Sequence, residues 1–379
     1  MNTRKRRILI FIDWFTPAYK AGGPIKSISN FVNHLSSDFN LFIVTSDRDL
    51  GDNHPFSNVK FNHWIQNDEY SIIYLSKDCQ KATFYHSILK KIKPDSIYLN
   101  SLFSYRFSIL PLICFKNIVK PIFLSPRGML GPESLRVKSL KKKFYLFVSK
   151  IIGIYKNVTW IACSETEQQE IFNIIGKNSS VNKIPNLPVI YSQTNSSNVS
   201  KEKGVLSIIC ICRISPIKNL TFLADVLSKV NGQVSLSIVG PIEDSSYWKQ
   251  CLLKFNSLNS NIKVNYLKEK TPFEITDLIN NHHFLISTSL NENYGHSIVE
   301  ALSVGCPVIV SNHSPWRELN ENFAGENLDL VIEQYAEKIN FYSLLNQTEF
   351  LKYRNGAIDY FKKKIDLDIF KEAYIRLFS

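Results

Sequence analysis

Two glutamates, Glu292 and Glu300, stand eight positions apart around a glycine and the expected start of a helix. The apolar run 284–289 is typical of a buried parallel strand, and apolar spacing predicts a helix over 297–304. Ligands of open α/β sheets bind at the carboxyl ends of strands, where helix N-termini attract phosphate. Carboxylates accept hydrogen bonds from vicinal sugar hydroxyls, and amides near Gly295 suit a diphosphate. Either glutamate alone could face solvent, but the whole constellation favours a site for a sugar and its phosphates.

The longer segment from Asn291 to Val310, with its Gly-Cys-Pro-Val ending, resembles the donor-sugar site of retaining glycosyltransferases of family 4. It is similar to bacterial capsule, O-antigen and exopolysaccharide transferases. The resemblance implies an α/β fold of the GT-B type, with two Rossmann-like domains facing a central cleft. It also implies that a hexose moves from a UDP- or GDP-linked sugar to a saccharide or polyprenyl-linked acceptor. The resemblance implies no metal or other cofactor, because basic side chains and helix amides would bind the leaving diphosphate. It implies no dedicated general base, because the departing phosphate would take the acceptor proton.

A basic loop extends the resemblance, with Arg213 and Lys218 after an expected strand and Cys212 where the family usually has glycine. The resemblance implies that both cations bracket the donor diphosphate, although either could be an ordinary surface residue. It makes Glu292 a third catalytic residue and Glu300 a ribose ligand rather than a nucleophile. The other donor-binding candidates are loop glycines and neighbours of the glutamates: Gly22, Gly23, Gly240, Tyr294, Gly295, His296 and Ser297.

Arg127 follows another expected strand, at the position where many family members carry a histidine near the reacting carbon. It is the fourth catalytic candidate and could bind the sugar, the diphosphate or an acidic acceptor. The alternative is a loop arginine paired with a carboxylate. Asn100 and Ser101, at the end of the preceding strand, are acceptor-side candidates. Glu165 is a third, with a plain helix-start role as its alternative.

The chain is basic, with a net charge of +12, and its densest basic run is Arg136–Lys150. Apolar residues fall at helical spacing within that run, which predicts an amphipathic helix. A solvated helix face and a peripheral contact with an anionic membrane remain alternatives. Nucleic acid is not an expected partner, because no helix-turn-helix, zinc, RRM or KH pattern accompanies the charge.

Several features favour a cytoplasmic enzyme, with peripheral contact at the inner face of the cytoplasmic membrane as an alternative. The seven cysteines form no CxxC pair and no metal-ligand spacing, as expected in a reducing compartment. The first apolar run, Ile8–Ile12, is short and ends in Asp13, so it predicts a strand rather than a signal peptide. The run 107–124 is interrupted by lysines and prolines and is too broken for a membrane span.

Strand and helix patterns alternate along two halves of the chain, which predicts doubly wound parallel sheets. The predicted parts are an acceptor-side domain over 1–190, a linker over 191–204, a nucleotide-sugar domain over 205–355 and a terminal helix over 356–379 that crosses back. Two other function classes stay open. A nucleotide-sugar epimerase of the same fold would lack the Glu292/Glu300 pattern, and a basic scaffold or nucleic-acid-binding protein would show no donor chemistry.

Overall fold

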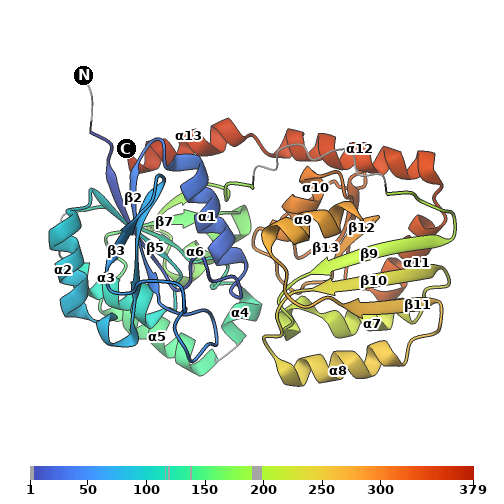
Figure 1. The fold of residues 1–379 in the computed structure, drawn as a ribbon, viewed down its shortest axis with the longest axis horizontal. Helices are drawn as coiled ribbons and strands as arrows, with labels where there is room; N and C mark the ends of the chain where they lie inside the picture. The colour runs from blue at the N-terminus through green and yellow to red at the C-terminus, as the bar shows by residue number, and fades with distance from the viewer. Residues whose placement is uncertain (1–3, 116, 118–119, 137–138, 190–198) are drawn as a thin grey trace. The chain divides into compact units, whose positions relative to one another are not determined.

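The structure, a computed structural model, describes residues 4–115, 117, 120–136, 139–189 and 199–379. It divides into two compact units, which Figure 1 shows with helices on the faces of two sheets. Unit 1 contains Met1–Leu187 together with Leu367–Ser379, and unit 2 contains Pro188–Asp366. The expectation of two parallel-sheet α/β domains is confirmed.

Unit 1 is built on a sheet whose described strands run in the order β3-β4-β2-β1-β5-β6-β7-β8. Neighbouring strands are parallel except β3, which is antiparallel to β4. The chain leaves β1 toward β2 on one side and resumes at β5 on the other, so ligands are expected where β1 and β5 end. The strands are β1 (Arg7–Ile12), β2 (Asn40–Ser46), β3 (Trp64–Gln66), β4 (Tyr70–Leu75), β5 (Ser96–Asn100), β6 (Ile122–Ser125), β7 (Val158–Ala162) and β8 (Ser180–Lys183).

Helices bury both faces of this sheet, which explains why β1 is apolar at every position after Arg7. Ile8 and Ile10 pack with Phe31 of α1, whereas Leu9 and Phe11 pack on the opposite face with α2 and α3. The helices of unit 1 are α1 (Gly23–Leu35), η1 (Lys77–Cys79), α2 (Ala82–Ile92), the π-helix η2 (Tyr105–Ile109), α3 (Leu110–Phe115), α4 (Pro132–Arg136), α5 (Ser139–Ile151), α6 (Glu165–Ile174) and α13 (Leu367–Phe378).

Unit 2 has a sheet of parallel strands in the order β11-β10-β9-β12-β13-β14. Its direction of winding reverses between β9 and β12, which marks the ends of these two strands as the ligand position. The strands are β9 (Val205–Ile211), β10 (Gln233–Val239), β11 (Ile262–Tyr266), β12 (Phe284–Ser287), β13 (Val308–Ser311) and β14 (Gly325–Leu328). The helices are η3 (Pro216–Lys218), α7 (Leu220–Leu227), α8 (Ser245–Asn256), α9 (Pro272–Asn280), α10 (His296–Ser303), α11 (Ile332–Ser343) and α12 (Gln347–Lys364).

The C-terminal segment differs in detail from the single helix expected over 356–379. Ile365 is extended and separates α12, which belongs to unit 2, from α13, which belongs to unit 1. Within unit 1, Phe378 packs against Phe123 at 4.5 Å and Phe31 at 5.6 Å between ring centroids. The chain therefore returns to unit 1 through α13 alone.

The expected linker over 191–204 is described only from residue 199 onward, and 191–198 lies outside the described residues. Lys201 is buried in unit 2, where its ammonium donates to the carbonyls of Ser343 and Leu345 at 2.8 and 2.9 Å. Burial lowers the pKa of Lys201 to about 8. Residues 199–204 are thus an integral part of unit 2.

Candidate active site

The loops that follow β9 and β12 are bonded to each other at the switch point of the unit 2 sheet. The amide of Leu290 donates to the carbonyl of Ile217 at 2.8 Å. The hydroxyl of Thr288 lies 3.3 Å from the carbonyl of Lys218 and 3.2 Å from that of Asn219. These bonds hold the basic loop and the glutamate loop together, although about 70 residues separate them in sequence.

Lys218 and Glu292 form an ion pair at this place, with 2.6 Å between Nζ and Oε2. Their side chains are only 17% and 19% exposed, and Ser289 Oγ donates to the same carboxylate oxygen at 3.3 Å. Burial alone would lower the pKa of Lys218, but the adjacent carboxylate raises it, so the amine stays charged. The structure therefore brings together two of the predicted catalytic residues.

Arg213 lies on the same loop but pairs with a different carboxylate, that of Glu243, at 2.8 Å. This pair is more exposed, at 34% and 41%, and therefore contributes little to stability. A diphosphate could replace Glu243 at a small cost in free energy, because an exposed ion pair is weak. Sequence reasoning did not identify Glu243, which follows a weak strand-Gly-Pro signal.

Gly240 ends β10 with φ +137°, a conformation that other residues rarely adopt. A Cβ atom at this position would stand 2.0 Å from the carbonyl oxygen of Cys212. The glycine therefore lets the end of β10 approach the end of β9, whose backbone carries Arg213. Its predicted donor-side role is consistent with this geometry as a support for the basic loop.

Helix α10 begins at the glycine between the two glutamates. Gly295 has φ +77°, and no side chain caps the first turn. The backbone amides of that turn are the groups that an incoming phosphate would bind, with His296 and Ser297 at its first positions. Tyr294 is held beside them, since its carbonyl accepts from Trp316 Nε1 at 2.7 Å and its ring packs on His296 at 4.9 Å.

Glu300 lies further along α10 and is only 2% exposed. The alternative of a solvent-facing glutamate is therefore wrong for this residue. Packing around α10, rather than attraction to solvent, therefore fixes the position of the Glu300 carboxylate. Glu292, by contrast, lies on the loop and is accessible from outside.

In unit 1, Arg127 lies at the end of β6 with φ +56° and its guanidinium turned toward the end of β5. Its Nη2 donates to Tyr98 Oη at 2.9 Å and Asn100 Oδ1 at 2.6 Å, and its Nη1 donates to Asn186 Oδ1. All three acceptors are neutral oxygens. The expected alternative of an arginine paired with a carboxylate is not what these hydrogen bonds show. Within the described chain, Arg127 Nε and Asn100 Nδ2 are buried without a hydrogen-bond partner.

The other predicted residues of unit 1 occupy different positions. Gly22 has φ +64° and immediately precedes α1, so Gly22 and Gly23 form the helix start after β1. Ser101 adjoins Asn100 at the end of β5. Glu165 lies apart from these groups, because its side chain is 78% exposed and approaches Lys183 at 3.7 Å.

Two positions after Glu165, Glu167 is the buried carboxylate of this region. It is 1% exposed and accepts the amides of Gly128 at 2.6 Å and Cys163 at 2.8 Å. These bonds fix the turn that carries Arg127. Glu167 was missed because the sequence gives the same helix-start pattern for both glutamates.

Comparison with known proteins finds a family model that is similar to unit 2. Residues 192–364, which lie within unit 2, match the family model described as Glycosyl transferases group 1. The resemblance to GT-B glycosyltransferases expected from the sequence is thereby confirmed, and no curated protein sequence matches the chain.

Solved structures similar to the chain cover both units. HepE of Anabaena, in complex with UDP and glucose, has a TM-score of 0.71 at 15% identity over 98% of this chain and 99% of that chain. Sucrose-phosphate synthase of Thermosynechococcus elongatus has a TM-score of 0.72 at 14% identity, covering 99% and 98%. TarM of S. aureus, in complex with Fondaparinux, alpha-GlcNAc-glycerol and UDP, has a TM-score of 0.70 at 13% identity, covering 99% and 100%.

Among the described residues, no group of three or more His, Cys, Asp or Glu side chains is arranged to hold a metal ion. Asp47 forms an ion pair with Arg48, and Asp49 accepts hydrogen bonds from backbone amides, so both carboxylates already have partners within the protein. No helix within the described ranges is long and apolar enough to cross a bilayer.

Proposed function

We propose that this protein is a retaining, metal-independent glycosyltransferase that moves a hexose from a nucleotide diphosphate sugar to a saccharide or lipid-linked saccharide. Its role would lie in the synthesis of a surface polysaccharide. The observation that carries the proposal is the convergence of Lys218, Glu292 and the start of α10 at the switch point of unit 2. Cations and helix amides suit a diphosphate, and carboxylates suit sugar hydroxyls.

In the proposed reaction, an acceptor hydroxyl oxygen bonds to the anomeric carbon while the bond from that carbon to the phosphate oxygen breaks. The departing phosphate oxygen takes the acceptor proton, so no separate base is needed. Arg213, Lys218 and the α10 amides stabilise the charge that accumulates on the diphosphate. Glu292 would orient the hexose, and Glu300 would bind the ribose.

A UDP-linked sugar is the first donor to test, and GDP-linked sugars are the second. HepE, whose structures contain UDP, UDP-glucose or glucose, supports this order. The assay incubates the full chain with UDP-glucose or GDP-mannose and a saccharide panel, with EDTA present. We expect release of one nucleoside diphosphate and an α-configured product from an α-linked donor, seen by proton NMR. An inverted product, or a donor sugar interconverted without an acceptor, would contradict the proposal.

We also propose that the acceptor is reached at an anionic membrane, through the exposed face of α5. Leu140, Phe144, Phe147 and Ile151 recur at helical spacing on this face and are 84%, 70%, 65% and 67% exposed. The opposite face is anchored instead, since Ser149 is buried. A stripe of four large apolar residues on one exposed face is typical of helices that lie in the interface of a bilayer.

Basic residues accompany the stripe, which favours anionic lipid as the partner. Lys141, Lys143 and Lys150 lie on α5 beside the apolar residues, whereas Lys142 is turned inward and lies 5.1 Å from the Phe103 ring. Val137 and Lys138 of the predicted basic helix lie outside the described residues. Each basic residue near an anionic surface adds about 1 kcal/mol, so apolar insertion and charge act together.

Vesicle co-sedimentation tests this surface. We expect the protein to bind phosphatidylglycerol vesicles and to bind phosphatidylcholine vesicles weakly, and the double variant Phe144→Ser/Phe147→Ser to lose most of the binding. Phe273→Ser is the matched control, because Phe273 is 83% exposed but lies on α9. Equal loss in the control, or no loss in the double variant, would contradict the membrane role.

A further inference from the structure

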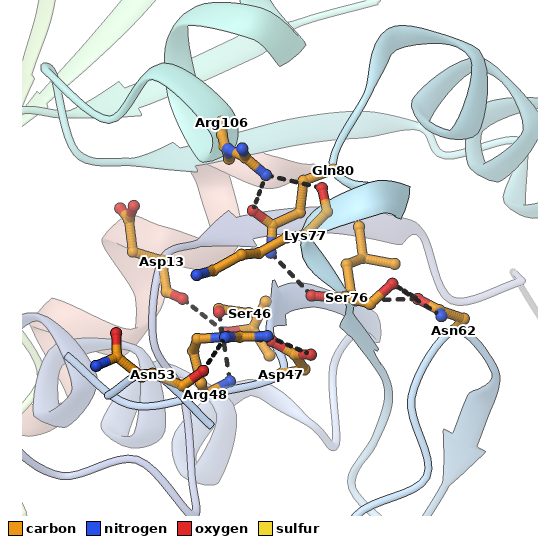
Figure 2. A network of polar contacts seen from close by, with 12 residues as sticks. Asp13, Ser46, Asp47, Arg48, Asn53, Asn62, Ser76, Lys77, Gln80 and Arg106 are labelled. Carbon is orange, nitrogen blue, oxygen red and sulfur yellow. Dashed lines mark hydrogen bonds and ion pairs between the residues drawn. The ribbon is translucent and has the colours of Figure 1, made fainter. Parts of the chain in front are cut away.

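A pocket of about 410 Å³ lies in unit 1 beyond the ends of β1, β2, β4 and β5. All of its lining residues belong to unit 1, and Figure 2 shows part of their network. Among these strands, only β1 is followed by a loop that was predicted to bind the donor, the loop with Gly22 and Gly23. The charged side chains around the pocket are therefore available for something other than the nucleotide.

Several of these charges are already satisfied within the protein. Arg48 forms a two-pronged ion pair with Asp47, at 2.8 and 3.1 Å, and donates to the carbonyl of Asn53 at 2.6 Å. Asp52 pairs with Lys20 at 2.5 Å. Asp49 accepts backbone amides, including that of Leu50 at 2.7 Å. These groups form part of the pocket wall, but they already have partners within the protein and are not free to bind a ligand.

Two cations differ from that pattern, because no carboxylate of the described residues forms an ion pair with them. Arg106 donates through Nη1 to the carbonyl of Lys77 at 2.8 Å and to Gln80 Oε1 at 3.0 Å, both neutral acceptors. Within the described residues, the ammonium of Lys77 has neither an ion pair nor a hydrogen bond. Figure 2 shows Lys77 extended past Gln80 toward the side where Asp13 and Ser46 lie. The wall thus presents two positive charges, of which Arg106 is held by hydrogen bonds to Lys77 and Gln80.

Asp13 provides the complementary acceptor at the end of β1. Its Oδ1 accepts from Ser104 Oγ at 2.5 Å, and in Figure 2 the carboxyl group points away from the Asp47–Arg48 pair. Burial raises the pKa of Asp13 to about 6, so the group can both accept and, at lower pH, donate a hydrogen bond. Such a carboxyl suits a hydroxyl group of a saccharide.

The segment after β5 shows a second, independent sign of a binding site. Ser101 has φ +151°, which is strained for a residue with a side chain, and its carbonyl accepts from the buried Ser108 hydroxyl. A single π-helical turn, η2, follows at Tyr105–Ile109, and such turns are frequent at functional sites. Tyr105 presents a ring that is 63% exposed at the pocket edge, where it could stack on a sugar.

We propose that this pocket binds the acceptor and selects a saccharide that carries a carboxylate or phosphate group. Lys77 and Arg106 bind the anionic group, Asp13 accepts a hydroxyl hydrogen, and Tyr105 packs against the sugar ring. This inference rests on the proposed transferase function and names the substrate class of its acceptor. A neutral sugar would leave both cations without a counter-ion, which is the basis of selection.

Ligand-observed NMR on the full chain tests the selection with three probes: a methyl glucuronide, glucose 6-phosphate and methyl glucoside. We expect saturation transfer to the carboxylate or phosphate sugar, or to both, and little to the neutral one. Lys77→Gln and Arg106→Gln should each weaken that binding about tenfold, as expected for loss of one charge-assisted hydrogen bond. Lys91→Gln is the matched control, since Lys91 is exposed on α2 of the same unit and does not line the pocket.

Equal binding of the neutral and anionic sugars would overturn the inference, and so would anionic binding that Lys77→Gln and Arg106→Gln leave unchanged. UDP titration of the same variants separates this failure from failure of the proposed function. Loss of the anionic sugar with UDP binding retained supports the pocket. If the wild type binds the anionic sugar but no nucleotide, the pocket assignment stands and the transferase proposal fails.

Discussion

The cations of the candidate site in unit 2 have carboxylate partners, whereas two arginines near the candidate sites of unit 1 do not. In unit 2, Lys218 and Arg213 each contact a carboxylate, at 2.6 and 2.8 Å. In unit 1, Arg127 and Arg106 donate to neutral oxygens instead. The same sheet architecture therefore gives one set of cations with protein counter-ions and another set without them.

This difference indicates how each unit would meet an anion. A diphosphate arriving in unit 2 replaces existing carboxylate partners, so binding is an exchange and its net gain is small per contact. An anionic group arriving in unit 1 meets cations that have only neutral partners. We therefore expect removal of a carboxylate partner to raise the affinity of unit 2 for a diphosphate. In unit 1, we expect removal of a cation to lower the affinity for an anionic group.

The largest expected effect is a loss of stability in unit 2, where Gly240 lets the ends of β9 and β10 approach each other. Gly240→Ala places a Cβ atom 2.0 Å from the Cys212 carbonyl oxygen at φ +137° and should destabilise unit 2 by about 4 kcal/mol or more. Chemical denaturation measures the loss. Gly204→Ala is the matched control, with φ +93° but open space around its Cβ, and should lose about 1 kcal/mol. Similar losses in both variants would show that the close approach is unimportant.

Glu292→Gln sharpens the comparison by removing the counter-ion of Lys218. Calorimetry should show UDP binding several-fold tighter, because the freed ammonium no longer exchanges partners. Sugar transfer should fall about a hundredfold, since the hexose loses its carboxylate. Weaker UDP binding would mean that Glu292 positions Lys218 rather than competing for it. Glu333→Gln, at an exposed site on α11, serves as the control.

A smaller effect concerns the stability of unit 1 and its pH dependence. Burial raises the pKa of Asp13 from 3.8 to about 6, so the folded state disfavours the charged form. The resulting penalty is absent below pH 3.8, grows between pH 3.8 and 6, and is complete above pH 6. Asp13→Asn should thus stabilise the protein by on the order of 2 kcal/mol at pH 8 and not at pH 3.5. Equal stabilisation at both pH values would show that burial of the charged Asp13 carboxylate is not the cause.

Much of the framework was predictable because its signals are local. The strands β1, β9 and β12 are mostly apolar, and the glycine before α10 marks the turn between Glu292 and Glu300. Three short strands were not predicted. β3 has only three residues, Trp-Ile-Gln, and β8 is largely polar, and both lie at the edges of their sheet. β14 has the sequence Gly-Glu-Asn-Leu, so none of the three has the apolar run of a buried strand.

The residues missed by the sequence analysis depend on contacts between distant segments. Lys77 follows β4 and Arg106 follows β5, and only the sheet order places both beside Asp13. Helical spacing in 139–151 correctly indicated an amphipathic helix, but periodicity cannot say which face is covered. The structure leaves Phe144 and Phe147 exposed and anchors the helix through Ser149 and its neighbours.

The most direct test of the account is calorimetric titration of UDP into the full chain in EDTA, with Lys218→Ala and Lys229→Ala as a matched pair. Lys229 is exposed beyond the end of α7, away from the loops after β9 and β12. We predict binding to the wild type and to Lys229→Ala, weakened at least tenfold in Lys218→Ala by loss of a charge-assisted contact. Binding that is equal in both variants, or absent from the wild type, would contradict a nucleotide diphosphate site at the switch point of unit 2.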